Sequence, residues 1–350
     1  MIDISASFSC PLPKMDYKTV QLAHGAGGRL SAELIDKIFL PCFSNETLNR
    51  LEDQATLNLP SGRLAFTTDS FVVNPVFFPG GNIGELAVNG TVNDVCMSGA
   101  KPLYLSVGFI LEEGLDIEEL HKIVLDMRRA ADKAGVQIVT GDTKVVNKGA
   151  CDKLFINTSG IGVIDDGVNI SAANLQPGDK ILLSGTIADH GMAVMTVREG
   201  LSFRSQILSD TAALNHLVSD MLAVSKDIRA MRDPTRGGLA TTLNELAKSS
   251  QVGIHIFQDK IPVRDEVNSA CEILGIDPLY VANEGKLVAV VPAEKAENIL
   301  QKMKRNEAGK DACIIGEVTE EHKEMVVMQN TLGVDRVIDV PLGEQLPRIC

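Results

Sequence analysis

Five aspartates in this 350-residue sequence have Gly, Ser, Thr or Asn within three residues and do not read as part of charged helix faces. They occur in the segments EDQA, TTDS, VNDVCMSGA, TGDT and RDPTRGGL, as Asp53, Asp69, Asp94, Asp142 and Asp233. Carboxylate oxygens in such settings suit Mg²⁺, which keeps several waters and bridges to substrate phosphates. Each aspartate alone has a plainer explanation, because Asp is a common turn former and helix cap. Five together favour a metal–phosphate site, although spacing alone does not show that they converge.

A second candidate for chemistry is Cys350, the last residue of the stretch PLGEQLPRIC. Two prolines and a glycine in ten residues disfavour a helix, and each proline removes a backbone donor, so we expect an extended arm over 341–350. At ~3.3 Å per residue, such an arm could carry a thiol roughly 30 Å from its anchor. The plainer alternative is a frayed terminus with an incidental cysteine.

Three other side chains could contact an anion. His24 lies in the glycine-rich segment HGAGGR, before a helix that we expect Ser31 to cap, and glycines before a helix N-terminus suit an anion. An ordinary surface turn is the alternative, and the spacing is not that of a Walker loop. Arg236 follows a turn and could reach a phosphate, whereas His190, at an expected helix start, could equally be a structural cap.

The overall composition narrows the class of protein. The net charge of −13 disfavours nucleic-acid binding, because no basic stripe is available to neutralise phosphates. No apolar run reaches membrane-spanning length, and the first twenty residues do not read as a secretory signal. Seven cysteines without a CxxC pair argue against a disulfide framework or a thiolate zinc site, and they fit a reducing cytoplasm.

The hydrophobic pattern predicts two mixed halves in an α+β architecture. In the first half we expect strands at 52–59, 63–73, 102–111, 136–143 and 153–164, and helices at 31–39 (with Ser31 as its cap), 84–100 and 116–134. In the second half we expect strands at 180–185, 253–257, 283–291 and 313–318, and helices from 189, at 215–224, after the turn of Asp233, at 264–274 and at 293–304. The predicted domain boundaries give a leader and glycine-rich segment (1–45), a first domain (46–166), a second domain (167–335) and a flexible arm (336–350).

The aspartate segments, in this order and at these spacings, resemble the ATP-binding superfamily of aminoimidazole ribonucleotide synthetase, which includes selenophosphate synthetase and thiamine-monophosphate kinase. Within that group, the segments HGAGG, FFPGGNIG, GFILEEGL, TGDTKVV, KLFINTSGIG, DHG, NEGKL and PRIC look like the HypE family of hydrogenase maturation proteins. The resemblance covers about residues 20–350, and the terminal PRIC is its most specific part.

The resemblance implies a two-domain fold whose N-terminal strands pair across a homodimer, with ATP and Mg²⁺ bound near that interface. A HypF carbamoyltransferase would load a carbamoyl group onto Cys350. ATP would then drive dehydration of the thiocarbamate to a thiocyanate. The cyano group would pass to iron on a HypC–HypD complex, on the way to a [NiFe]-hydrogenase active site.

The resemblance also implies roles for individual residues, carried over by motif. Besides Cys350, the residues implied for catalysis are Glu284 of NEG, Lys144 of GDTK and His24. The cofactor-binding residues implied are Asp53, Asp69, Asp94, Asp142, Asp233, Asn82 of FFPGGNIG, and Arg236. The metal ligands implied are Asp53, Asp94, Asp142 and Asp233.

Two alternatives remain at this point. A cousin in the same superfamily could phosphorylate a free small molecule, although HGAGGR lacks the reactive cysteine usual in selenophosphate synthetases, and such kinases have no reason to end in PRIC. A non-catalytic carrier could use Cys350 only to shuttle a carbamoyl group, with ATP as a structural ligand. ATP hydrolysis that depends on a carbamoylated arm would separate the dehydratase from the carrier.

Overall fold

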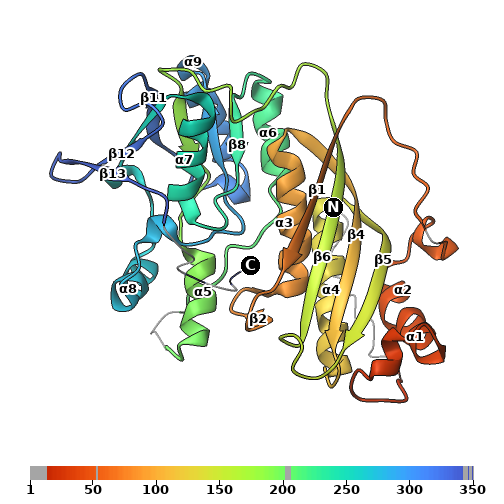
Figure 1. The fold of residues 1–350 in the computed structure, drawn as a ribbon. Helices are drawn as coiled ribbons and strands as arrows, with labels where there is room; N and C mark the ends of the chain where they lie inside the picture. The colour runs from red at the N-terminus through yellow and green to blue at the C-terminus, as the bar shows by residue number, and fades with distance from the viewer. Residues whose placement is uncertain (1–13, 53, 202–205, 342–345, 347–348, 350) are drawn as a thin grey trace.

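The computed structural model of this protein describes residues 14–52, 54–201, 206–341, 346 and 349. Its N-terminal half is built on a four-stranded sheet in the order β1-β6-β4-β5, with α3 and α4 packed together against one face (Figure 1). The strands and longer helices of this half are β1 (Arg63–Phe71), β2 (Phe77–Phe78), β3 (Gly81–Asn82), α3 (Ile83–Met97), β4 (Ala100–Glu112), α4 (Ile117–Ala134), β5 (Gln137–Val146) and β6 (Leu154–Ile164).

Helix α4 shows why these sequences form these elements. The Asp116 side chain caps the helix by accepting the N–H of Glu118 at 2.7 Å, and Gly135 ends the helix in the left-handed conformation that glycine tolerates. Leu120 and Ile123 recur at helical spacing and are completely buried against the sheet and α3. The predicted range of this helix is confirmed.

The C-terminal half carries a seven-stranded sheet in the order β13-β12-β9-β11-β7-β10-β8, which lies beside the first half in Figure 1. Within this seven-stranded sheet, the β12–β9 pair is parallel and the other described pairs are antiparallel. Its elements are β7 (Lys180–Leu183), α5 (Asp189–Arg198), α6 (Asn215–Val224), β8 (Ala230–Arg232), α7 (Gly238–Ser250), β9 (Gly253–Phe257), α8 (Asp265–Leu274), β10 (Val288–Val291), α9 (Ala293–Met303), β11 (Cys313–Thr319), β12 (Val326–Gln329) and β13 (Asp335–Ile338). The predicted α+β class is confirmed.

Four expectations about elements were wrong. No strand forms in the described residues between 51 and 62. The helix expected from Ser31 to Phe39 is instead broken into short segments, α1 (Arg29–Leu34), the π-helical η2 (Ile35–Phe39) and α2 (Leu40–Phe43), which follow the 3-10 helix η1 (Leu22–Gly25). Ser31 lies inside α1 and accepts the Gly27 N–H, so it is not the helix cap. Strand β13 occupies part of the expected arm, which therefore cannot begin before residue 339.

Hydrogen bonds of Asn93 on α3, whose side chain is 1% exposed, join the two halves. Its amide nitrogen donates to the carbonyl oxygens of Ala212 (3.0 Å) and Glu284 (3.3 Å), and its oxygen accepts the N–H of Leu214 (2.8 Å). A buried side-chain amide with its hydrogen bonds made in this way orients the segments it joins. Two loops of the second half are thereby held against the first. Among the described helices, none has the length and apolar character needed to cross a membrane.

Candidate active site

Four acidic side chains come together where the two halves meet. Asp69 lies on β1, Asp94 on α3, Asp233 just after β8, and Glu284 in the loop before β10. The structure thus brings together three of the five predicted aspartates and the predicted base. Asp69 and Asp94 lie inside the strand and the helix that the sequence predicted at 63–73 and 84–100. Asp53 lies outside the described residues.

The electrostatics of this acid cluster, Asp69, Asp94, Asp233 and Glu284, are those of carboxylates crowded together without enough positive charge. Burial and, after it, the charge of Asp94 raise the pKa of Asp233 to about 7. Burial raises the pKa of Glu284 well above its ordinary value, and the charge of Asp233 adds to the shift. The Oε1 atom of Glu284 has no hydrogen-bond partner among the described residues. Such a cluster favours a bound cation or a ligand that donates protons.

No group of three or more His, Cys, Asp or Glu side chains in the described part of the chain is arranged to hold a metal ion. Asp94 and Asp233, two of the implied ligands, lie in the acid cluster. The prediction that Asp142 belongs with them is not supported by its position: it lies inside β5, not at a strand end, and its nearest charged partner is Lys144, at 3.4 Å.

Asp142, Lys144 and His24 line a different part of the molecule, a cavity of about 440 Å³ between the first helices and the β4–β5 face. The Asp142 and Lys144 side chains are 71% and 67% exposed. His24 is 1% exposed; its Nδ1 accepts the N–H of Gln21 at 2.9 Å, and its Nε2 has no hydrogen-bond partner among the described residues. Within one chain, therefore, Lys144 and Glu284 belong to different groups of residues.

The remaining candidates differ in their surroundings. Asn82 caps α3 by accepting the N–H of Gly84 (2.8 Å), and its amide nitrogen donates to Asp126 (2.6 Å), so the structure gives this side chain a structural use. Arg236 is exposed; burial raises the pKa of Asp69 and the charge of Arg236 opposes this shift, so the guanidinium lies near the acid cluster. Of the two, only Arg236 is positioned to meet a phosphate there.

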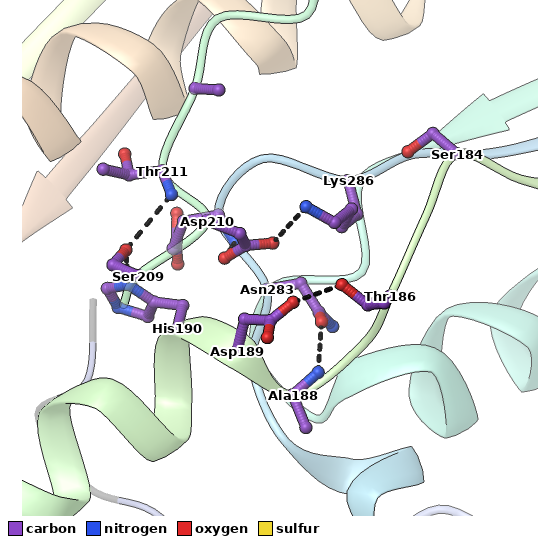
Figure 2. A network of polar contacts seen from close by, with 12 residues as sticks. Ser184, Thr186, Ala188, Asp189, His190, Ser209, Asp210, Thr211, Asn283 and Lys286 are labelled. Atoms are coloured by element: carbon purple, nitrogen blue, oxygen red, sulfur yellow. Dashed lines mark hydrogen bonds and ion pairs between the residues drawn. The ribbon is translucent and has the colours of Figure 1, made fainter. Parts of the chain in front are cut away.

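The sequence analysis missed an ion pair directly beside Glu284. The Nζ atom of Lys286 lies 3.2 Å from Oδ2 of Asp210, and these side chains are only 13% and 3% exposed (Figure 2). The other oxygen of Asp210 accepts the backbone N–H of Glu284 at 3.1 Å. A Cβ atom on Gly285 would lie 1.8 Å from the Asp210 carbonyl oxygen, so only glycine permits this approach. Lys286 lies in NEGKL, one of the segments that resemble the HypE family, whereas no motif around Asp210 indicated that it belongs to the site.

A second set of contacts ties the Glu284 loop to the start of α5. Asn283 is completely buried; its side-chain oxygen accepts the N–H of Ala188 (2.7 Å), and its nitrogen donates to the carbonyl oxygen of Pro234 (2.8 Å). Asp189, also fully buried, accepts a hydrogen bond from Thr186 (Figure 2). The NEG, RDP and DHG segments therefore pack together as one unit.

Four described cysteines lie in places that suppress thiolate formation. Burial raises the pKa of Cys151 and Cys313 to about 11, of Cys271 to about 12, and of Cys96 well above its ordinary value. Since the thiolate is the reactive form, these thiols are expected to be inert. Cys350 lies outside the described residues.

Asp233→Asn is expected to stabilise the ligand-free protein at pH 8. The folded-state pKa of Asp233 is raised to about 7, so the stability this group contributes in its neutral form is lost as the pH rises through 7. We expect a gain of roughly 1–3 kcal/mol in the free energy of unfolding at pH 8, and a smaller gain at pH 5. Urea unfolding of both proteins at the two pH values, without nucleotide or Mg²⁺, measures this gain in the free energy of unfolding. The exposed Asp259 provides a control as Asp259→Asn, and a less stable Asp233→Asn at pH 8 contradicts the argument.

Comparisons with known proteins agree with this arrangement. The N-terminal and C-terminal domain families of the AIR synthase related proteins match residues 51–164 and 176–329. Carbamoyl dehydratase HypE of Azotobacter vinelandii is 52% identical over 332 residues, covering 95% of this chain and 97% of that protein. A crystal structure of hydrogenase maturation protein HypE in complex with ATP superimposes with a TM-score of 0.92 at 51% identity, covering 95% of this chain and all of the other.

A HypE–HypF complex structure also contains a similar chain, with a TM-score of 0.78 and 53% identity over 88% of this chain and 99% of the other. Identity near one half, over nearly the whole length of both proteins, is far beyond what a shared fold alone requires. The chain therefore belongs to the HypE family of carbamoyl dehydratases, within the AIR synthase related proteins.

Proposed function

We propose that this protein uses ATP to dehydrate a carbamoyl group, carried as a thiocarbamate on Cys350, to a thiocyanate for the iron of a [NiFe]-hydrogenase. The observation that carries the proposal is Glu284, a buried carboxylate with an unpartnered oxygen at the junction of the two halves. Ile349, one peptide bond before Cys350, packs in the same hydrophobic cluster as Ala282, two residues before Glu284. Glu284 and the residue that precedes the proposed carrier therefore lie in the same region of the molecule.

The reaction requires two balanced steps. The carbamoyl oxygen attacks the γ-phosphorus of ATP, the amide loses one N–H proton, and ADP leaves. The remaining N–H proton is then removed as the C–O bond breaks and phosphate leaves, so that a nitrile carbon stays on sulfur. Glu284 is suited to accept an N–H proton because its Oε1 is unpartnered and its raised pKa makes it a stronger base than an exposed glutamate.

The chain offers groups for ATP at two places. Lys144 and His24 line the open cavity beside the glycine-rich segment and supply positive charge and a hydrogen-bonding nitrogen. Arg236 lies near Asp69. We propose that these three hold the phosphates, since the solved HypE relative is a complex with ATP. In the alternative role, Lys144 orients the carbamoyl group instead of a phosphate.

The acid cluster fits Mg²⁺, because its carboxylates are hard oxygen ligands with too little positive charge around them. We propose that Asp94 and Asp233 would hold the ion, with Asp69 beside them. When bound, Mg²⁺ would neutralise phosphate charge near the transferring group. Asp53 stays a prediction, and Asp142, which pairs with Lys144, is the weakest of the implied ligands.

The partners follow from the same assignment. A similar chain has been solved as a HypE–HypF complex, which supports HypF as the carbamoyl donor. We propose HypC–HypD as the cyano acceptor because the resemblance to the HypE family implies that complex. A superfamily kinase for a free small molecule, or a passive carrier, remains an alternative outcome of the tests.

We further propose that the outer face of the N-terminal sheet forms a homodimer. On β1, the edge strand of this sheet among the described residues, Leu64 and Phe66 are 54% and 71% exposed, and Ile110 of β4 is 42% exposed. An apolar face next to an open edge is a surface that a second copy could cover.

Phe66→Asp is expected to weaken this dimer at least 10-fold, since a charge would be buried in an apolar interface. Analytical ultracentrifugation across a concentration series measures the shift towards monomer. Leu332→Asp is the matched control, because Leu332 is 86% exposed in the β12–β13 turn. A variant of Phe66 that dimerises like the wild type would place the interface elsewhere.

The test of the proposed function is the intact mass of the C-terminal peptide, taken after carbamoylation and again after adding Mg-ATP. A gain of one carbamoyl group at Cys350 followed by loss of one water supports the dehydratase. Carbamoylation without ATP-dependent loss of water supports a carrier. No modification at Cys350 supports a kinase for a free substrate.

A further inference from the structure

The residue before Cys350 is held inside the protein. Ile349 is 2% exposed and packs in the hydrophobic cluster that contains Val194 of α5 and Ala282. Its carbonyl oxygen lies 2.8 Å from Nε2 of His190. A described part of the expected free arm is therefore docked at both its side chain and its backbone.

The contacts of His190 determine which of its nitrogens carries the proton. The Ile349 carbonyl oxygen can only accept, so Nε2 of His190 must donate. Nδ1 lies 2.8 Å from Oγ of Ser209, which in turn accepts the N–H of Thr211 at 3.1 Å (Figure 2). Ser209 therefore donates its hydroxyl proton to Nδ1, and every polar atom in this chain of contacts is satisfied by a neutral imidazole.

The surroundings of His190 agree with the neutral form. The ring is completely buried, and Phe78 packs edge-on against it with ring centroids 5.3 Å apart. Burial lowers the pKa of His190, while the charge of Asp210 and the bond to Ile349 act in the opposite direction. His190 lies at the start of α5, as predicted, but its ring bonds Ser209 and the Ile349 carbonyl and is not a helix cap.

The segment that orients His190 also orients the proposed base. Ser209 holds the imidazole, and the next residue, Asp210, accepts the backbone N–H of Glu284 and pairs with Lys286. Two adjacent residues of one loop thus connect the docked end of the arm with Glu284. A shift of this loop would move the arm and the base together.

We propose that His190 and Ser209 form a docking site for the carbonyl group of Ile349 and, through it, position the thiocarbamate on Cys350 for dehydration. They act as positioning residues and take no part in bond making. This inference rests on the proposed function for its kinetic consequence, whereas the docking itself can be tested without it.

The first measurement is docking in the unmodified protein. His190→Phe keeps an aromatic ring but removes the donor, so the arm should leave its site more often and iodoacetamide should alkylate Cys350 about 5- to 10-fold faster, the loss of one hydrogen bond. His190→Gln can still donate from its amide nitrogen and should stay within about 3-fold of the wild type. Peptide mass mapping assigns the label to Cys350.

The second measurement is the single-turnover rate of ATP-dependent water loss from carbamoylated protein. His190→Phe should lower this rate about 10- to 100-fold, because misplaced reacting groups lose orientation, and His190→Gln should restore most of it. Nucleotide affinity and the melting temperature should change little. Ser209→Ala should show the same two effects, more weakly, since the imidazole stays in place but loses its partner at Nδ1.

A matched control is His216→Phe. Nε2 of His216 also bonds a carbonyl oxygen, that of Lys133, at 3.0 Å, but on the exposed side of α6. Both measurements should be unchanged in this variant. Wild-type alkylation and dehydration rates in His190→Phe would overturn the proposal. If wild-type protein loses no water while His190→Phe still accelerates alkylation, the docking site stands and the proposed dehydration fails.

Discussion

Cys350→Ala is expected to abolish ATP-dependent thiocyanate formation completely. In the proposed reaction the sulfur of Cys350 carries the carbamoyl group throughout, so its removal leaves no substrate. Cys271 and Cys313, among the described residues, are poor replacements, because burial raises the pKa of Cys271 to about 12 and of Cys313 to about 11. Tethering gives the thiocarbamate a high effective concentration at the site, which a free carbamoylated thiol would lack. Mass spectrometry after incubation with HypF, carbamoyl phosphate and Mg-ATP measures the product.

Nucleotide affinity serves as the internal control for this variant. The residues proposed to hold ATP, Lys144, His24 and Arg236, lie on other elements, so Cys350→Ala should bind ATP like the wild type. Cys313→Ala is the matched cysteine control and should keep full activity. Turnover by Cys350→Ala would transfer the carrier role to another group and remove the arm from the mechanism.

The sequence predicted helices and strands best where the local residue pattern alone determined their bounds. The apolar spacing and cap of α4 allowed its bounds to be placed within one residue. The strand expected at 52–59 failed because alternation there was not matched by a partner strand in the described residues. β5 runs past its glycine to Val146 because each residue from Gly141 onward pairs with β4. Tertiary pairing, which the sequence does not show, decided both cases.

The residues of the candidate site could be predicted from the sequence only in part, and the prediction came from motifs. Asp69, Asp94, Asp233 and Glu284 were identified through their motifs, while their convergence became visible only in the structure. Asp210 could not have been found, since it stands in LSDTAA without a pattern and meets Glu284 across 74 positions of sequence. Asn82 was assigned to the cofactor because it lies in a recognised segment, whereas its amide caps a helix. Motifs locate a site, but they do not show which of its residues are structural and which take part in the reaction.

That distinction matters for the Lys286–Asp210 pair. A nearly buried ion pair costs desolvation and adds little net stability, so its value here is to orient the backbone of Glu284. Because Asp210 also adds to the raised pKa of Glu284, the same pair that orients the base makes it a stronger proton acceptor. The scaffold around Glu284 therefore affects its chemistry as well as its position.

Glu284→Gln is expected to lower the single-turnover rate of dehydration by about 10²- to 10⁴-fold, the usual contribution of a general base. Glutamine keeps the size of the side chain, and the backbone N–H bond to Asp210 is unaffected, so folding and ATP binding should persist. The wild-type rate should rise with pH, since only the carboxylate accepts a proton and its pKa is raised, first by burial and then by the charge of Asp233. The variant should lose this dependence.

The pH profile separates a base from a merely structural glutamate, because a structural role would lower the rate equally at every pH. Glu294→Gln is the matched control, since Glu294 is exposed on α9 and should leave both the rate and its pH profile unchanged. Stopped reactions between pH 6 and pH 9, read by peptide mass, give the comparison. A Glu284→Gln rate within 3-fold of the wild type, with the same pH profile, would assign proton removal to another group, and Lys144 would then be the next residue to test.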